Sequence, residues 1–431
     1  MARTRIVATL GPATDDETRL AALLDAGVDV VRLNFSHGTH AEHGRRIAAV
    51  RRLAAGRPIA ILQDLGGPKL RLDRPVRAEP GDVVELRLPA TVLPGDPVLL
   101  ADGIMQLEVI DAARSRAVTG GDIPAGKGIN LPSSRLDLPA FTDKDRRDLA
   151  FGVAQGVDLV ALSFVEQPSD LDAAKASGLP VLAKIERARA LDHLDALVAA
   201  ADGVLVARGD LGVEIPIERV PLLQKRLVRL ANRAAKPVIV ATQMLRSMVT
   251  SPLPTRAEAT DVANAVLDGA DAVMLSEETA VGQFPVEAVR VMQRILRATE
   301  SELPPQGHDP DAGVSENVAR AACALADQVG AAAIVVATRS GFSARNIARH
   351  RPRVPVVALT PDESTRRRLS LVWGVTALAT AWFDDTDALL ARFRDAVRPT
   401  GLVPDGAPVV VAAGWPFADA GTTNLVHVTA M

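Results

Sequence analysis

Short apolar runs recur at a regular interval over the first 276 residues of the 431-residue chain, and this rhythm indicates the fold. Eight runs rich in Val, Ile and Leu begin at Thr4, Val28, Pro58, Val157, Pro180, Asp202, Pro237 and Asp271. All but one of the spacings between them lie between 22 and 35 residues, and most intervals contain an Ala-, Leu- and Arg-rich helical pattern. Eight strands that alternate with helices predict an α/β fold, a (β/α)₈ TIM barrel.

One interval interrupts the barrel. The third and fourth runs begin 99 residues apart, and the segment between them alternates short apolar and polar runs with Pro-Gly turns. We therefore expect a small inserted β domain over residues 72–136, and a barrel formed by residues 1–71 and 137–303. After the linker LPPQGHDPDAG, residues 311–431 predict a separate α/β domain with a helix, a strand, a second helix, a second strand, a further helix and two late strands.

The composition excludes several classes of protein. The chain carries 49 basic and 52 acidic residues, so its net charge of −3 does not draw it strongly to nucleic acid or membranes. Aromatic residues, at 3%, are too few for a nucleic-acid stacking surface, and no apolar run reaches the roughly 18 residues that a membrane span needs. The single cysteine, Cys323, excludes a disulfide framework, and we expect it to be a buried helix residue of a cytoplasmic protein without nucleic-acid or membrane partners.

Polar residues follow seven of the eight expected strands. Because the catalytic groups of such barrels gather at the carboxyl ends of the strands, these side chains are candidates for one site. They are Arg32, Asn34, Ser36, Asp64, Ser163, Lys184, Glu186, Arg208, Asp210, Thr242, Gln243, Ser276 and Glu278. Convergence from seven strands indicates a site more strongly than any single carboxylate does.

Two of these residues suit a divalent metal ion. Glu186 and Asp210 supply the carboxylate oxygens that Mg²⁺ or Mn²⁺ prefers, and Arg32 and Lys184 add positive charge around them. A metal with Arg and Lys favours phosphoryl transfer, in which the protein mainly positions and neutralises the charged group. The alternative is a buried ion pair of Lys184 with Glu186 that supports the barrel, which leaves the other two charges without partners.

A glycine-containing loop is expected after the sixth strand. The segment RGDLGVEIP, residues 208–216, places Gly209 and Gly212 around Asp210, which predicts tight turns with free backbone N–H groups. An anionic substrate could dock there, or the segment could be only a structural loop.

Several longer segments carry a resemblance to a known family. They are TRIVATLGPAT (4–14), VVRLNFSHG (30–38), DLGGPKLR (64–71), GKGINLP (126–132), LAKIE (182–186), ARGDLGVEIP (207–216), KPVIVATQML (236–245), PTRAEATDVANAVLDGADAVMLSEETA (254–280) and GTTN (421–424). Over essentially its whole length the chain resembles the pyruvate kinase family. The resemblance implies transfer of the phosphoryl group of phosphoenolpyruvate to ADP, with Mg²⁺ or Mn²⁺, to give pyruvate and ATP, and it suggests a homotetramer.

The resemblance also assigns roles to individual residues. Glu186 and Asp210 would hold the metal, Lys184 would stabilise the transferring phosphoryl group, and Arg32 would bind phosphate. The residues that would face ADP and its phosphates are Asn34, His37, Arg71 and Lys127. For His37 a purely structural hydrogen-bonding role stays open.

The substrate carboxylate and the enolate have their own candidates. Backbone N–H groups near Gly209 and Asp210, together with Thr242, would hold the carboxylate. Thr242 would also belong to the proton path to the enolate, since no free acid of matched pKa is obvious.

One departure from the family concerns a monovalent cation. Members of the family hold K⁺ near the residues that match Asn34, Ser36, Asp64 and the carbonyl of Leu65. The K⁺-dependent members have Glu where this chain has Lys69, so our hypothesis is that the Lys69 ammonium replaces K⁺ and that activity needs no K⁺. Leu65 and Leu72 are similar to the apolar neighbours in K⁺-independent members, whereas Gly66 departs from them. The alternative is a surface lysine beside Pro68.

Two other features differ from the family. The inserted domain is shorter than usual, which bears on whether it closes as a lid over the nucleotide. Glu166 stands where the family often has Arg, and its type predicts no role.

A loop in the last domain resembles the family's effector phosphate loop. Its candidate residues are Thr338, Arg339, Ser340, Gly341 and Ser343, which suit a sugar phosphate or a nucleotide. Asp419, near a second expected phosphate position, would repel a bisphosphate. An unregulated structural loop is the alternative.

Two other functions are alternatives to a kinase. A metal-dependent lyase or aldolase acting on pyruvate-like acids would share the metal carboxylates but would not need Lys127 or an inserted domain. A catalytically dead barrel that only binds an effector predicts the loss of key residues. Those residues are all present: Lys184, Glu186, Asp210 and Thr242.

Overall fold

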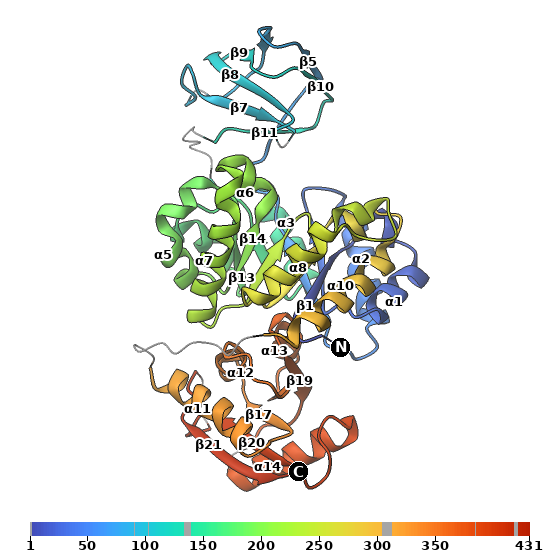
Figure 1. The fold of residues 1–431 in the computed structure, drawn as a ribbon, viewed down its shortest axis with the longest axis vertical. Helices are drawn as coiled ribbons and strands as arrows, with labels where there is room; N and C mark the ends of the chain where they lie inside the picture. Colours follow the sequence, from blue (N-terminus) through green and yellow to red (C-terminus); the bar gives the residue numbers. More distant parts are fainter. Residues whose placement is uncertain are drawn as a thin grey trace.

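The computed structural model describes residues 2–89, 91–101, 103–132, 139–303, 313–383, 385–417 and 421–431. Three parts follow one another along its longest axis (Figure 1): a small antiparallel β domain, the barrel in the middle and a C-terminal α/β domain. The expected architecture of a barrel with an inserted and a C-terminal domain is therefore confirmed.

The barrel is a closed parallel sheet of eight strands, as the sequence predicted. Its strands pair in the order β1-β16-β15-β14-β13-β12-β3-β2. They are β1 (Arg5–Thr9), β2 (Val30–Asn34), β3 (Ala60–Asp64), β12 (Leu159–Leu162), β13 (Val181–Ile185), β14 (Gly203–Ala207), β15 (Val238–Ala241) and β16 (Ala272–Leu275). Helices cover the outside and side chains such as Leu62 and Ile239 fill the inside, so the strands are apolar on both faces.

Three of the barrel helices begin with the same cap. A threonine accepts a hydrogen bond from the backbone three residues later, and the acid at that position reaches back, in α2 (His40–Leu53), α3 (Asp143–Ala154) and α8 (Arg256–Leu267). The other helices around the barrel are α1 (Glu17–Asp25), α4 (Asp172–Lys175), α5 (Leu194–Ala200), α6 (Arg208–Glu214), α7 (Val220–Arg233), α9 (Glu277–Ala280) and α10 (Pro285–Glu300). Within the described ranges of the chain, every helix is too short or too polar to span a bilayer.

The inserted domain consists of short antiparallel strands around its own apolar core, which includes Leu100 and Leu107. Its main sheet has the order β4-β11-β7-β8-β9-β6, and β5 pairs with β10. The sheet already begins at Leu70, so it includes two residues that the sequence assigned to the barrel. The strands are β4 (Leu70–Arg71), β5 (Val76–Ala78), β6 (Val83–Glu85), β7 (Pro97–Leu100), β8 (Met105–Asp111), β9 (Arg114–Ala117), β10 (Gly121–Ile123) and β11 (Gly128–Asn130).

The C-terminal domain is a five-stranded sheet of order β19-β18-β17-β20-β21 with helices on both faces. The sequence predicted one helix and two strands after β18, whereas the described residues there form two α-helices and three strands. The missed strand β19 (Val375–Ala379) lies at the sheet edge and is only partly buried, so its apolar signal is weak. The other elements are α11 (Val314–Gln328), β17 (Ala333–Ala337), α12 (Phe342–Ala348), β18 (Val356–Thr360), α13 (Glu363–Arg368), α14 (Thr386–Val397), β20 (Pro408–Ala413) and β21 (Leu425–Ala430). Cys323 lies on α11 as expected, but it is half-buried instead of buried.

The C-terminal domain closes the N-terminal end of the barrel. Leu371 packs with the side chains that fill the barrel interior. Arg351 forms a buried ion pair with Asp271, Nη1 to Oδ1 at 3.0 Å, and Arg367 Nε lies 2.7 Å from Asp158 Oδ1. The carboxyl ends of the strands therefore open at the other end, toward the inserted domain (Figure 1).

Candidate active site

Charged side chains from three segments meet where β3, β13 and β14 end. Lys184 and Glu186 are two residues apart at the end of β13, so they point to the same side. Lys184 Nζ lies 3.0 Å from Glu186 Oε2, 3.9 Å from Asp64 Oδ1 and 3.0 Å from Ser163 Oγ. Asp210 lies in the first turn of α6, directly after β14. The barrel thus brings together one ammonium and three carboxylates that the sequence singled out.

These groups shift one another's pKa. Burial, reinforced by the charges of Asp210 and Asp64, raises the pKa of Glu186 to about 7, although Lys184 lowers it. Burial also acts to raise the pKa of Asp210, but the charges of Lys184 and Lys69 outweigh it and this pKa is lowered. For Lys184, burial acts to lower the pKa, but the surrounding carboxylates raise it above its ordinary value. Near neutral pH the cluster therefore holds a charged lysine, an ionised Asp210 and a Glu186 close to its titration midpoint.

Glu186 and Asp210 are the residues that fit a divalent cation. Glu186 Oε1 accepts the backbone N–H of Phe164 at 2.8 Å. Its Oε2 is buried and is contacted by the Lys184 ammonium. No group of three or more His, Cys, Asp or Glu side chains in the described ranges forms a fuller metal cage. Two carboxylates suit Mg²⁺ or Mn²⁺, which keeps water and substrate oxygens as its other ligands.

Arg32 reaches the same cluster from β2. Its Nε donates to Asp64 Oδ2 at 2.7 Å and its Nη1 donates to Thr9 Oγ1 at 3.0 Å. Asp64 is shared between Arg32 and Lys184, so one carboxylate holds both cations in place. The guanidinium and the ammonium can therefore act on one anionic group without first having to be ordered.

Thr242 lies on a strained turn after β15. Its φ of +72° is in the left-handed region, which a β-branched residue rarely adopts. Thr242 Oγ1 accepts the Gly209 N–H at 2.8 Å and donates to the Ala241 carbonyl at 2.6 Å. Arg208 holds the turn from outside, because its Nη2 donates to the Thr242 carbonyl at 2.7 Å. The Thr242 hydroxyl is thus fixed opposite the start of α6.

The segment after β14 forms the helix α6, so the expectation of tight turns there was wrong. Gly209 and Gly212 have no positive φ, since the helix continues through both. The Gly209 N–H is bonded to Thr242 Oγ1, so it is not free for a substrate carboxylate in this structure. Asp210, Thr242 and Lys69 border a cavity of about 330 Å³ at this point, which is large enough for a small ligand.

Lys69 contacts one of the candidate metal ligands. Its Nζ lies 3.4 Å from Asp210 Oδ1, the one ion pair that Lys69 forms within the described residues. Its side chain is 28% exposed and passes Gly128 of β11, where a Cβ would lie 3.1 Å from Lys69 Cε. This half-buried, paired position favours the site over the alternative of a surface lysine. The ammonium belongs to the site, on its Asp210 side.

The groups expected around a monovalent cation have partners within the chain. Asn34 Oδ1 accepts the Ser36 N–H at 3.1 Å, and the Leu65 carbonyl accepts the Ser163 hydroxyl at 2.8 Å. Asp64 is bound by Arg32, as described above. Oxygens of Asn34, Asp64 and Leu65, three of the four groups, are therefore already bonded inside the chain.

The residues expected to face ADP lie between the barrel and the inserted domain. Burial lowers the pKa of His37, and the positive charge of Arg71 lowers it further, which places His37 within electrostatic reach of β4. Arg71 and Lys127 are both exposed, on β4 and on the turn before β11. Asn34 ends β2. Of these four residues, His37 and Arg71 are the pair that the electrostatics bring near each other.

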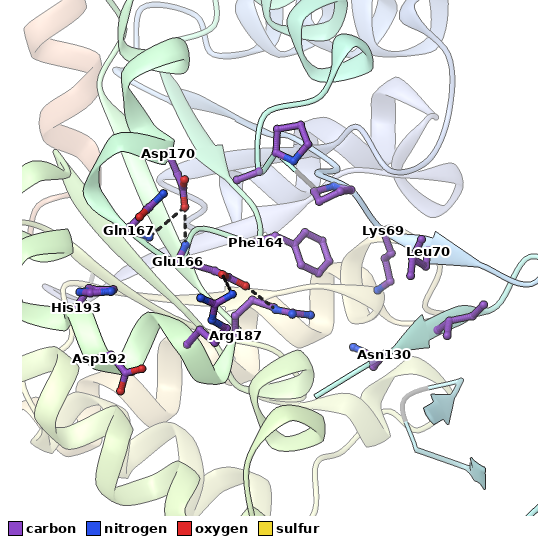
Figure 2. A pocket seen from close by; sticks show the side chains of 15 residues that line it. Lys69, Leu70, Asn130, Phe164, Glu166, Gln167, Asp170, Arg187, Asp192 and His193 are labelled. Atoms are coloured by element: carbon purple, nitrogen blue, oxygen red, sulfur yellow. Dashed lines mark hydrogen bonds and ion pairs between the residues drawn. The ribbon is translucent and has the colours of Figure 1, made fainter. Parts of the chain in front are cut away.

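A cavity of about 460 Å³ opens between the barrel and the inserted domain (Figure 2). Lys69 and Asn130 lie at one end of it, and Asn130 Oδ1 is buried without a hydrogen-bond partner in the described ranges. Phe164 lies beside them with a φ of +60°. Sequence reasoning missed Phe164 because it serves the site through its backbone N–H, which no side-chain type can indicate.

An ion-pair network borders the other end of this cavity (Figure 2). Glu166 Oε1 lies 3.3 Å from Arg187 Nε, and its Oε2 lies 3.1 Å from Arg189 Nη1. Arg187 Nη1 also lies 3.2 Å from Oε1 of Glu214, at the end of α6. Glu166, for which the sequence predicted no role, therefore helps to join the segment after β12 to the helix that carries Asp210.

The loop expected to bind an effector is bonded to itself. Thr338 Oγ1 accepts the Gly341 N–H at 2.9 Å, and the Ser343 hydroxyl donates to the Thr422 carbonyl at 3.1 Å. The cavity that this loop borders is only about 20 Å³, room for about one water molecule. Asp419, expected to repel a second phosphate, lies outside the described residues.

Comparisons with known proteins agree with this geometry. The family model described as "Pyruvate kinase, barrel domain" matches residues 1–88 and 78–289, and "Pyruvate kinase, alpha/beta domain" matches residues 316–429. The pyruvate kinase of Agrobacterium vitis is 45% identical over 99% of this chain and 98% of its own length. That of Methylorubrum extorquens is 43% identical over 99% and 97%, and pyruvate kinase 2 of Synechocystis sp. is 43% identical over 99% and 79%. Because both the barrel and the last domain match and the identity extends over nearly the whole chain, the chain belongs to the pyruvate kinase family.

Proposed function

We propose that this protein transfers the phosphoryl group of phosphoenolpyruvate to ADP and so forms pyruvate and ATP. The observation that carries the proposal is the contact of Lys184 with Glu186 at 3.0 Å beside Asp210. It places a permanent cation and two metal-binding carboxylates at one point, which is what phosphoryl transfer needs. The relatives named above are pyruvate kinases, and neither they nor the site support the alternative of a lyase.

Glu186 and Asp210 would hold Mg²⁺ or Mn²⁺, which when bound neutralises phosphate charge and orients substrate oxygens. Arg32 binds the phosphate of the substrate, and Lys184 Nζ donates to the phosphoryl oxygens. The bond from phosphorus to the enol oxygen breaks and a bond to a terminal oxygen of ADP forms. Because its pKa is raised, Lys184 stays charged throughout this transfer.

Transfer leaves an enolate, which takes up one proton at carbon to become pyruvate. Thr242 supports this step, since its Oγ1 is fixed at 2.8 Å from the Gly209 nitrogen and borders the cavity beside Asp210. We propose that the hydroxyl relays the proton from water. The backbone near Gly209 and Asp210 would bind the substrate carboxylate after the bond from Gly209 to Thr242 rearranges.

ADP would bind between the barrel and the inserted domain, against Asn34, His37, Arg71 and Lys127. The cavity of about 460 Å³ between the two domains gives the inserted domain room to move toward the barrel. The inserted domain, expected at residues 72–136, would also include Leu70 and Arg71 of β4, and the last domain would comprise residues 311–431.

Lys69 would make K⁺ unnecessary. Its ammonium already supplies one fixed positive charge beside Asp210, and three of the four groups matched to the family's cation site, Asn34, Asp64 and the Leu65 carbonyl, have partners within the chain. A second cation would add repulsion where the charge is already balanced. We further propose a cytoplasmic homotetramer, with the loop from Thr338 to Ser343 as a contact for a sugar-phosphate or nucleotide effector.

The test is pyruvate formation from phosphoenolpyruvate and ADP with Mg²⁺, in a Tris buffer free of K⁺. We expect activity that added K⁺ leaves unchanged. Lys184→Gln should abolish it, whereas Lys225→Gln, on α7 away from the strand ends, should keep it. Activity that appears only with K⁺ would overturn the role of Lys69 alone. The absence of pyruvate with either metal and with or without K⁺ would overturn the function.

A further inference from the structure

A cavity of about 160 Å³ lies at the junction of the barrel and the C-terminal domain, at the end of the barrel opposite the active site. The barrel contributes Asp202 and Lys236, which precede β14 and β15. The C-terminal domain contributes Ser340, Arg345 on α12 and Arg368 on α13. Apolar side chains from both domains complete the wall. Three cations and one acid therefore face a space that both domains enclose.

The single acid does not balance these cations. Asp202 Oδ2 accepts the Val181 N–H at 3.0 Å and also lies 3.9 Å from Lys175 Nζ, a lysine that does not line the cavity. Lys236 and Arg368 form no ion pair with any residue in the described part of the chain. The cavity lining thus has a formal net charge of +2. Its one acid, Asp202, also interacts with Val181 and Lys175, which do not line the cavity.

The surroundings of each cation disfavour its positive charge. Burial lowers the pKa of Lys236, and the charge of Arg345 lowers it further, against the raising effect of Asp202. Burial lowers the pKa of Arg345 as well, and its Nη1 donates to the Ser340 carbonyl at 3.1 Å. Arg368 Nε is buried and has no hydrogen-bond partner among the described residues. Buried cations that lie close together lower the stability of the folded protein unless a bound anion neutralises them.

We propose that this cavity binds inorganic phosphate or a small phosphomonoester. Two guanidinium groups offer paired donors that match phosphate oxygens, and Lys236 and the Ser340 hydroxyl add a charge and a donor. The volume is below the about 300–1,000 Å³ of pockets for drug-sized ligands, so the ligand is small. The site is separate from the transfer site and does not depend on the proposed activity.

The loop from Thr338 to Gly341 borders this cavity as well as the smaller one described above. The Thr338 hydroxyl is bonded within the loop, whereas Ser340 lines this cavity. A bound anion would link Lys236 of the barrel to Arg345 and Arg368 of the last domain. Binding would therefore stabilise the junction of the two domains, which makes unfolding a direct readout.

The first test measures phosphate binding by calorimetry and by the shift of Tm, against chloride at the same ionic strength. The wild-type protein should show a phosphate site that Arg368→Gln weakens about tenfold, the loss of one charge-assisted hydrogen bond. Lys236→Gln, on the other wall, should weaken it similarly. Arg392→Gln, an exposed arginine on α14, is the charge-matched control and should bind phosphate like the wild type.

Two further measurements separate the outcomes. Glycerol phosphate in place of phosphate should shift Tm more if the ligand is a phosphomonoester, and less if it is free phosphate. In phosphate-free buffer, Arg368→Gln should be at least as stable as the wild type, because it removes an unpaired cation. Equal phosphate affinity in all variants, or a lower Tm of both cavity variants without phosphate, would overturn the proposal and make these side chains structural.

Discussion

Lys69 and Asp210 form an ion pair between the connection into the inserted domain and the first turn of α6, with Nζ 3.4 Å from Oδ1. Asp210 is one of the two candidate metal ligands, so the charge of Lys69 acts on the metal site directly. It also lowers the pKa of Asp210, after the larger effect of Lys184. Lys69, which we expect to replace a monovalent cation, thus also lowers the pKa of Asp210, a carboxylate that would bind the divalent cation.

Reversing this charge should create a need for K⁺. At about 4 Å and an effective dielectric constant of about 20, one charge pair is worth about 4 kcal/mol, so Lys69→Glu should lower kcat without K⁺ by about a hundredfold or more. Added K⁺ should restore part of that activity. Lys69→Met loses the charge without gaining a cation ligand, so K⁺ should not restore it. Steady-state rates in K⁺-free buffer decide this, and an unchanged rate for Lys69→Glu would contradict the role of Lys69.

Divalent metal binding should release a proton below pH 7. The pKa of Glu186 is raised to about 7, so the metal-free protein carries a proton on this carboxyl at lower pH, and the metal must displace it. We expect the metal Kd to tighten about tenfold per pH unit up to pH 7 and to change little above it. Titrations with Mg²⁺ or Mn²⁺ between pH 5.5 and 8.5 measure this. Glu186→Gln should bind the metal weakly and without this pH dependence; a pH-independent Kd in the wild type would show that Glu186 is already ionised.

The sequence predicted the part of the site that side chains at strand ends supply. Lys184 and Glu186 were found because a charged pair at a spacing of two is unusual at the end of an apolar strand. Phe164 was not found, since its contribution is a backbone N–H directed by a positive φ. Arg187 was not found either, because it follows Glu186 on the opposite side of the strand and its partners are far away in the sequence.

For the fold, too, the sequence predicted some elements and missed others. The eight barrel strands are buried on both faces, and their apolar runs are continuous enough to be counted from the sequence. The edge strand β19 and the helix α6 were missed for opposite reasons. The strand has too little buried apolar surface to stand out, and the helix contains two glycines that favour a turn until packing on Thr242 and Arg187 fixes it.

Acid should destabilise the protein through His350. Burial, reinforced by the nearby charges of Arg349 and Arg320, lowers the pKa of this imidazole to about 4. The unfolded chain binds the proton near pH 6.5 but the folded chain only near pH 4, so stability falls as the pH drops through this window, by up to about 1.4 kcal/mol per pH unit. Urea unfolding of His350→Gln between pH 4 and 7 should show a flatter profile than the wild type. The exposed His193→Gln is the control, and identical slopes in all three proteins would contradict this account.

Arg187 should matter to the metal site although it touches no substrate. Its side chain is 5% exposed and joins Glu166 to Glu214, whose pKa is raised by burial, so it fixes α6 and with it Asp210. Arg187→Gln leaves the Glu214 charge buried without its partner, which should cost about 3–5 kcal/mol of folding free energy. It should also weaken divalent metal binding by about 10–100-fold, the usual effect of losing a group that orients a metal ligand.

The neighbouring arginine provides the matched control for that prediction. Arg189 pairs with the same Glu166, but it is 43% exposed, so Arg189→Gln should cost at most about 1 kcal/mol and leave metal affinity unchanged. Arg187→Lys should recover part of the affinity, because it keeps the charge but reaches only one of the two acids. If Arg187→Gln lowers stability while the metal Kd stays at the wild-type value, then the network supports the barrel alone and does not position Asp210.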